Sequence, residues 1–133
     1  MRTAMTTERL EEIRGTPVYS IDREKIGTVE DVYLDVPSGQ PEWLAVGAGI
    51  LSSQHRLVPM RGASFEEDGV VVPFTKEQAK DAPEVMPDAI SPHLENELLA
   101  YYRQHGEWGR EYGDPIHEPG ENIRIRRWQW EYR

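Results

Sequence analysis

The spacing of turn signals between residues 17 and 73 constrains the fold of this chain most strongly. Short segments rich in β-branched and aromatic residues alternate there with turns that contain Gly, Pro or Asp. The predicted strands, about six in number, cover residues 17–20, 26–36, 42–49, 55–60, 63–67 and 70–73. No helix-sized segment separates one strand from the next. The pattern therefore predicts a mainly β fold, a small antiparallel barrel that is closed or nearly closed on itself.

Two local patterns bear on how such a sheet would close. Apolar residues alternate from Val32 to Val36, but the gap between Val29 and Val32 breaks the period of two. A bulge or bend at that gap would restore a single inward face. The pair Asp68-Gly69 is typical of a tight hairpin turn between the last two strands.

Two helices are predicted after the strands. Thr75 is suited to cap a short helix that ends near Lys80, and Ser91-Pro92 begins a longer helix for which Gly106 is a suitable terminator. The longer helix carries an apolar stripe of Leu94, Leu98, Tyr101 and Tyr102. Such a stripe must cover a surface, which is either the barrel or another copy of the chain.

The last residues carry a strand pattern with an unusual composition. Ile123 and Ile125 alternate with arginines, and after a phase shift at Arg127 three aromatic residues alternate with polar ones; these are Trp128, Trp130 and Tyr132. Three alternatives stay open. The segment is a last strand of its own fold, a strand added to a neighbouring chain, or a nucleic-acid contact made through Arg124, Arg126 and Arg127.

The charge distribution favours protein partners over nucleic acid. Residues 122–133 hold four arginines and one glutamate, a net charge of +3, which leaves −12 on the rest of a chain whose total is −9. An acidic body repels phosphate, so nucleic-acid binding is expected only through the tail. The sequence contains no cysteine, no visible export signal and no apolar run long enough to span a bilayer, so we expect a cytoplasmic protein without a transmembrane segment.

Several titratable residues are candidates for a catalytic or metal-binding role. Asp31 and Asp35 would lie about 13 Å apart along one strand, too far for a cooperating pair, so they are interpreted as a solvated face or turn caps. His93 and Glu97 are four residues apart on the predicted helix but lack further ligands. His55 lies close to Ser52-Ser53 without a nucleophile motif. We therefore predict no catalytic residue, metal site or cofactor, and no enzymatic activity.

Three stretches resemble PRC-barrel domains of the stand-alone bacterial type. They are Gly15–Tyr19 followed by Asp22–Asp35, then Arg56–Met60, and finally Val71–Glu77 with Asp81–Pro83. Similar domains occur in the H subunit of photosynthetic reaction centres and in a ribosome-maturation factor. The resemblance implies a compact β-barrel used for protein contacts without a shared catalytic apparatus.

The expected organisation has four parts. Residues 1–14 form a flexible or short helical segment, 15–86 the barrel, 87–106 a linker and amphipathic helix, and 107–133 an irregular tail that ends in the aromatic and basic strand. The expected function is an adapter or assembly module that forms a homodimer through its helix and tail, and the alternative is a ribosome- or RNA-associated maturation factor. The predicted interaction residues are Leu94, Leu98, Tyr101, Tyr102, Ile123, Ile125, Arg126, Arg127, Trp128, Trp130 and Tyr132.

Overall fold

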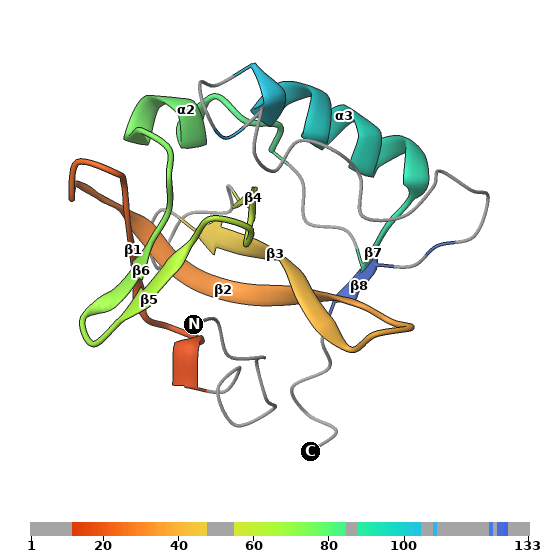
Figure 1. Ribbon diagram of the computed structural model, residues 1–133, viewed down its shortest axis with the longest axis horizontal. Helices are drawn as coiled ribbons and strands as arrows, with labels where there is room; N and C mark the ends of the chain where they lie inside the picture. The colour runs from red at the N-terminus through yellow and green to blue at the C-terminus, as the bar shows by residue number, and fades with distance from the viewer. Residues whose placement is uncertain are drawn as a thin grey trace.

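A single eight-stranded sheet forms the centre of the molecule (Figure 1). The computed structural model describes residues 12–47, 55–84, 88–104, 108, 123 and 125–127. The strands are β1 (Pro17–Tyr19), β2 (Lys25–Asp35), β3 (Gln40–Gly47), β4 (His55–Pro59), β5 (Ser64–Glu66), β6 (Gly69–Val71), β7 (Ala89–Ile90) and β8 (Ile125–Arg127). Helices α2 (Lys76–Lys80) and α3 (Pro92–Arg103) lie together on one side of this sheet (Figure 1).

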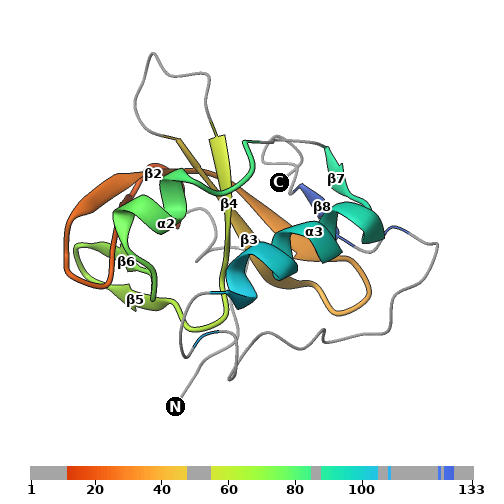
Figure 2. The ribbon, with the colours of Figure 1, turned by 90° about the horizontal axis from the view of Figure 1, so that it is seen from above.

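Strand β2 organises the sheet because other strands pair along both of its edges. On one edge β3 pairs antiparallel with Thr28–Asp35. On the other edge β1 pairs with Lys25–Thr28 and β8 pairs with Tyr33–Asp35, both antiparallel. Strand β8 thus pairs with the far end of this edge, beyond the part that β1 covers. Figures 1 and 2 show β7 and β8 at one end of the molecule and the β5–β6 hairpin at the other.

The predicted bulge in β2 is confirmed. Its register against β3 shifts between Val29 and Asp31, and a second shift lies between Tyr33 and Leu34. An extra residue bends a strand and increases its local twist. These two shifts let one long strand contact β1 at its beginning and β8 at its end.

Both faces of the central strands are buried. Tyr33 lies opposite Trp43 in the register, so their side chains share one face, and Val32 and Leu44 share the other. The Trp43 ring contacts Tyr102 of α3, which identifies the first face as the one beneath the helix. The buried core comprises Ile13, Val18, Val29, Val32, Tyr33, Trp43, Leu44, Ala45, Val46, Leu57, Val58, Met60, Val70, Val72, Phe74, Ala82, Ile90, Leu98, Leu99, Tyr102, Trp108 and Ile125.

Both helices begin at the predicted caps. Thr75 and Gln78 form a reciprocal capping box, with the Gln78 N–H donating to the Thr75 hydroxyl over 3.1 Å and the Thr75 N–H donating to the Gln78 side chain over 2.9 Å. The Ser91 hydroxyl accepts a bond of 3.1 Å from the backbone N–H three residues later. Helix α3 ends with Gln104 as its C-cap, and Gly106 lies outside the described residues.

The predicted fold class is confirmed, with three differences in detail. Strands β1 to β6 match the six predicted segments, but β1 and β6 pair parallel, which residue alternation alone could not indicate. The sheet is not closed by strand pairing, because its order begins at β4 and ends at β5. At β4, the Tyr102 hydroxyl donates to the Leu57 carbonyl, and Arg56 forms an isolated antiparallel bridge with Glu84. Strand β7 lies in the linker that was predicted before the longer helix, within residues 87–106.

Close contact between β2 and β3 depends on Gly27. A Cβ atom at Gly27 would lie 2.1 Å from the carbonyl oxygen of Gly47, a backbone atom that cannot move without separating the strands. We expect Gly27→Ala to destabilise the fold by about 1–3 kcal/mol, measured by urea unfolding. Lys25→Ala, an exposed change on the same strand, should stay within about 0.5 kcal/mol of the wild type. Equal stability of the two variants would contradict the close approach.

Candidate interaction surface

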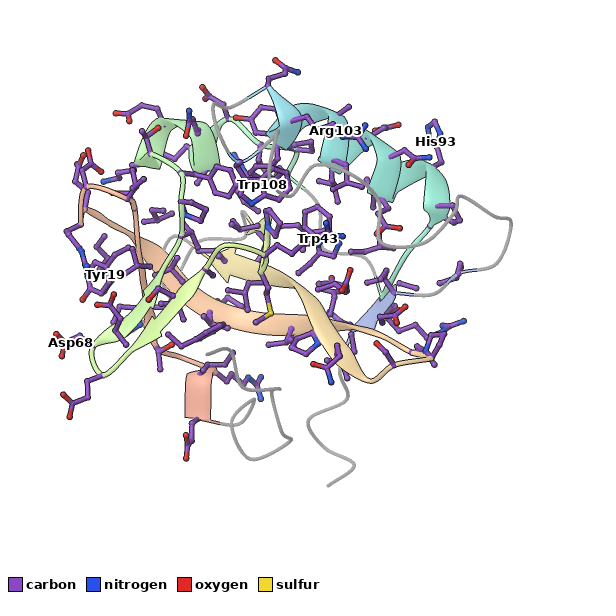
Figure 3. All side chains as sticks on the ribbon, in the orientation of Figure 1. Tyr19, Trp43, Asp68, His93, Arg103 and Trp108 are labelled. Carbon is purple, nitrogen blue, oxygen red and sulfur yellow. The ribbon has the colours of Figure 1, made fainter. Side chains whose placement is uncertain are left out.

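The apolar stripe of α3 packs on the chain's own barrel. Leu98 and Tyr102 are fully buried, and Leu94 and Tyr101 are partly buried against the same core. The sequence allowed this stripe to cover either the barrel or another copy of the chain. In the structure it packs on the barrel. The labelled side chains on the outer side of the helix are polar, as Figure 3 shows for His93 and Arg103. Leu98 and Tyr102 are therefore interior residues, whereas Leu94 and Tyr101 are only partly covered by the barrel.

Tyr102 is the centre of an aromatic cluster that joins α3 to the sheet. Its ring centroid lies 4.8 Å from that of Phe74, 6.2 Å from that of Trp43 and 6.1 Å from that of Trp108. The Tyr102 hydroxyl donates to the Leu57 carbonyl over 2.5 Å, and burial raises the pKa of this phenol. Figure 3 shows Trp43 and Trp108 in the layer between sheet and helix.

Trp108 is a core residue, although it lies in the segment predicted to be an irregular tail. Its indole N–H donates to the Arg61 carbonyl over 2.9 Å, and its side chain is buried against Phe74. No periodic pattern surrounds Trp108, so its size was the one signal that could have marked it as buried. The core consequently extends beyond the end of α3.

The terminal strand pairs within its own chain at the three residues of β8. Ile125 is fully buried, opposite Asp35 of β2 and Ile90 of β7. This is the first of the three alternatives that the sequence left open for the tail. Arg126 is exposed, and Ile123 is 42% exposed. The remaining predicted residues of the tail, Trp128, Trp130 and Tyr132, lie outside the described part of the chain.

Arg127 stabilises β8 through polar contacts with Asp88. Its backbone N–H donates to the Asp88 carbonyl over 2.9 Å, and its guanidinium pairs with the Asp88 carboxylate. Burial raises the pKa of the neighbouring Tyr33 phenol, an effect that the positive charge of Arg127 opposes. Arg127 therefore has a carboxylate partner within its own chain.

Exposed aliphatic side chains mark the end of the pairing between β2 and β8. Val36, which follows β2, is 56% exposed, and Ile123, which lies two residues before the start of β8, is 42% exposed. Because Asp35 lies opposite Ile125, both side chains belong to the same end of this ladder. We call Val36, Ile123 and the exposed Arg126 the ladder-end surface. The third large exposed aliphatic residue of the described chain, Ile21, lies in the turn between β1 and β2.

The titratable residues that were candidates for catalysis or metal binding have structural contacts instead. Asp35 accepts bonds from the Ser38 backbone N–H and hydroxyl, as expected for a turn cap. Asp31 is only 9% exposed, so its interpretation as part of a solvated face is wrong: β2 is covered on both sides. His93 and Glu97 form an exposed pair at 2.6 Å on α3. Across the described residues, no group of three or more His, Asp or Glu side chains is arranged to hold a metal ion.

His55 is placed beside a carboxylate. Its Nε2 lies 3.9 Å from Glu30 Oε1, and Ser52-Ser53 lies outside the described residues. The contact joins β4 to β2 beside Gly47, where an added Cβ atom would lie 2.8 Å from the Glu30 side chain. This arrangement is an ordinary cross-strand contact between polar side chains.

Residues 5–79, more than half of the 133-residue chain, match the PRC-barrel domain. The chain belongs to the PRC-barrel family. PRC-barrel domains are protein-interaction modules. The match ends within α2, so β7, α3, Trp108 and β8 form an extension that follows the family's domain. No curated protein matches the chain, and no described helix is long and apolar enough to cross a membrane.

Proposed function

We propose that this PRC-barrel protein is a non-catalytic adapter or assembly module that associates with a second copy of itself through the ladder-end surface. The supporting observation is that two of the three large exposed aliphatic side chains among the described residues, Val36 and Ile123, lie at that one end of the sheet. The apolar stripe of α3, which was predicted as a dimer contact, packs on the chain's own barrel. Within the described part of the chain, the ladder-end surface is the apolar surface that this proposal assigns to a partner.

Membership of the PRC-barrel family supports a role in protein contacts. The chemistry of the ladder end supports the same class of partner, because an aliphatic pair beside an exposed arginine is typical of protein interfaces rather than of a nucleic-acid surface. The RNA-associated alternative has weaker support. Arg127 is already paired with Asp88, and the body outside residues 122–133 carries a net charge of −12 against +3 in that segment.

Sedimentation velocity of the full chain over a range of concentrations tests this proposal. We expect Val36→Ser combined with Ile123→Ser to weaken self-association at least about tenfold, since each change removes a buried aliphatic contact. Ile21→Ser is the matched control, because Ile21 is 59% exposed but lies in the β1–β2 turn. This control variant should associate like the wild type.

Two results would contradict the proposal. One is a wild-type chain that stays monomeric at the highest concentration, and the other is equal association of the ladder-end variant and the wild type. Salt-dependent binding of a single-stranded RNA oligonucleotide that disappears in Arg126→Ala would support the RNA alternative instead.

A further inference from the structure

Strand β8 lies between two other strands of its own chain. Tyr33–Asp35 of β2 and Ala89–Ile90 of β7 both pair with β8, one on each of its edges. We call these two segments the acceptor site. On this edge of β2, β1 pairs only with Lys25–Thr28, so the acceptor site lies in a portion of the edge that β1 does not reach.

The contacts between β8 and the acceptor site are specific. Ile125 is fully buried, and the Arg127 side chain pairs with Asp88 immediately before β7. The Arg127 backbone N–H also donates to the Asp88 carbonyl over 2.9 Å. A three-residue strand therefore carries one apolar anchor and one charged anchor, which together fix its register.

The chain that leads to β8 is long. Residues 109–124 connect buried Trp108 to Ile125, and at about 3.3 Å per residue such a segment can span about 50 Å. That length is sufficient to deliver β8 to the acceptor site of a neighbouring molecule while α3 and Trp108 stay in their own core. Every copy of the chain carries the same acceptor site, so β8 of one copy fits that of another with the same contacts.

We propose that the acceptor site binds Ile125–Arg127 of a second copy in place of the chain's own β8, so that two molecules exchange their terminal strands. This proposal rests on the proposed self-association and gives it a mechanism. Val36 follows the β2 part of the acceptor site and Ile123 lies two residues before β8, so in the exchanged form these two exposed side chains come from different copies at the same junction. Intramolecular binding competes at an effective concentration of the order of millimolar, so the exchanged form increases with protein concentration.

Cysteine trapping tests the exchange, because the natural chain contains no cysteine. Leu34 and Arg126 lie directly opposite each other in the ladder, within the range of Cα distances that a disulfide needs. Full-length Leu34→Cys and affinity-tagged Arg126→Cys are mixed in reducing buffer at high concentration and then mildly oxidised. We expect a covalent heterodimer of the two variants to accumulate.

The matched control replaces Arg126→Cys with Ala100→Cys, an exposed position on α3 that does not face β2. Heterodimer formation should exceed this control at least about tenfold, in line with the local concentration that strand pairing provides. The double variant Leu34→Cys with Arg126→Cys should form a disulfide within one chain, which shows that these two positions can be cross-linked. If the double variant forms its internal disulfide but heterodimer formation does not exceed the control, the exchange is overturned.

The two proposals fail in different ways. If the internally cross-linked double variant still self-associates in sedimentation velocity, and that association is still lost on changing Val36 and Ile123, the ladder-end dimer stands and the strand exchange is overturned. If cross-linking abolishes the association, the exchange is supported. If neither heterodimer nor association is detected, both proposals are overturned.

Discussion

A chain that ends at Glu84 should fail to fold cooperatively, although it retains the whole PRC-barrel match. The truncation removes the core side chains of Ile90, Leu98, Leu99, Tyr102, Trp108 and Ile125. Deleting a single large buried side chain costs about 2–5 kcal/mol, and small domains have a total stability of about 5–15 kcal/mol. We expect the shortened chain to lose its sharp thermal transition and to bind a hydrophobic dye, because Trp43 and Phe74 lose their cover.

A shorter deletion gives the matched control. Removal of residues 128–133 takes away no described core side chain, so the thermal midpoint should remain close to that of the intact protein. A chain ending at Glu84 that unfolds as cooperatively as this control, with a similar midpoint, would contradict the account of a shared core.

Tyr102→Ala should produce the largest loss of stability among single substitutions in the extension. It removes a ring that contacts four other aromatic residues and a hydroxyl that donates to the Leu57 carbonyl of β4. We expect a destabilisation of about 3–5 kcal/mol in urea unfolding. Tyr102→Phe keeps the ring and leaves the carbonyl without this donor, which should cost about 1–3 kcal/mol.

Asn96→Ala is the control for both Tyr102 variants because Asn96 is exposed on the same helix. Its effect should remain within about 0.5 kcal/mol. A Tyr102→Ala variant no less stable than Asn96→Ala would mean that α3 does not pack on the barrel. A Tyr102→Phe variant as stable as the wild type would show that the edge carbonyl needs no side-chain donor.

Local signals in the sequence were sufficient for most individual elements. Residue alternation, turn residues and caps identified β1 to β6, the bulge after Val29, and both helix starts at Thr75 and Ser91. The parallel pairing of β1 with β6 was not predictable in this way, since alternation shows which residues are buried but not the direction of a neighbouring strand.

The candidate surface was harder to predict than the fold. An amphipathic helix has the same pattern whether its stripe covers its own chain or a partner, so Leu98 and Tyr102 could not be assigned from spacing. Ile125 posed the same difficulty, because strand alternation does not identify the paired edge. Val36 and Ile123 became apparent only when the neighbouring strands were placed and two aliphatic side chains were left exposed.

The division between the family's domain and the extension does not correspond to a division in the core. The PRC-barrel match ends at residue 79, but the layer beneath α3 is built by Trp43 and Phe74 from the domain together with Tyr102 and Trp108 from the extension. A domain and its extension that share one core are expected to unfold together. This shared core is the central feature of the molecule.

Native-state hydrogen exchange tests most directly whether the PRC-barrel domain and the extension share one core. The helical amides of Leu98, Leu99 and Tyr102 should open with the same free energy as amides of the central strands at Val32, Leu44 and Val58, and should respond equally to denaturant. Helical amides that exchange at least about tenfold faster than the strand amides, a difference of about 1.4 kcal/mol, and show no common opening would contradict it. The extension would then be a separately unfolding cover rather than part of the barrel's core.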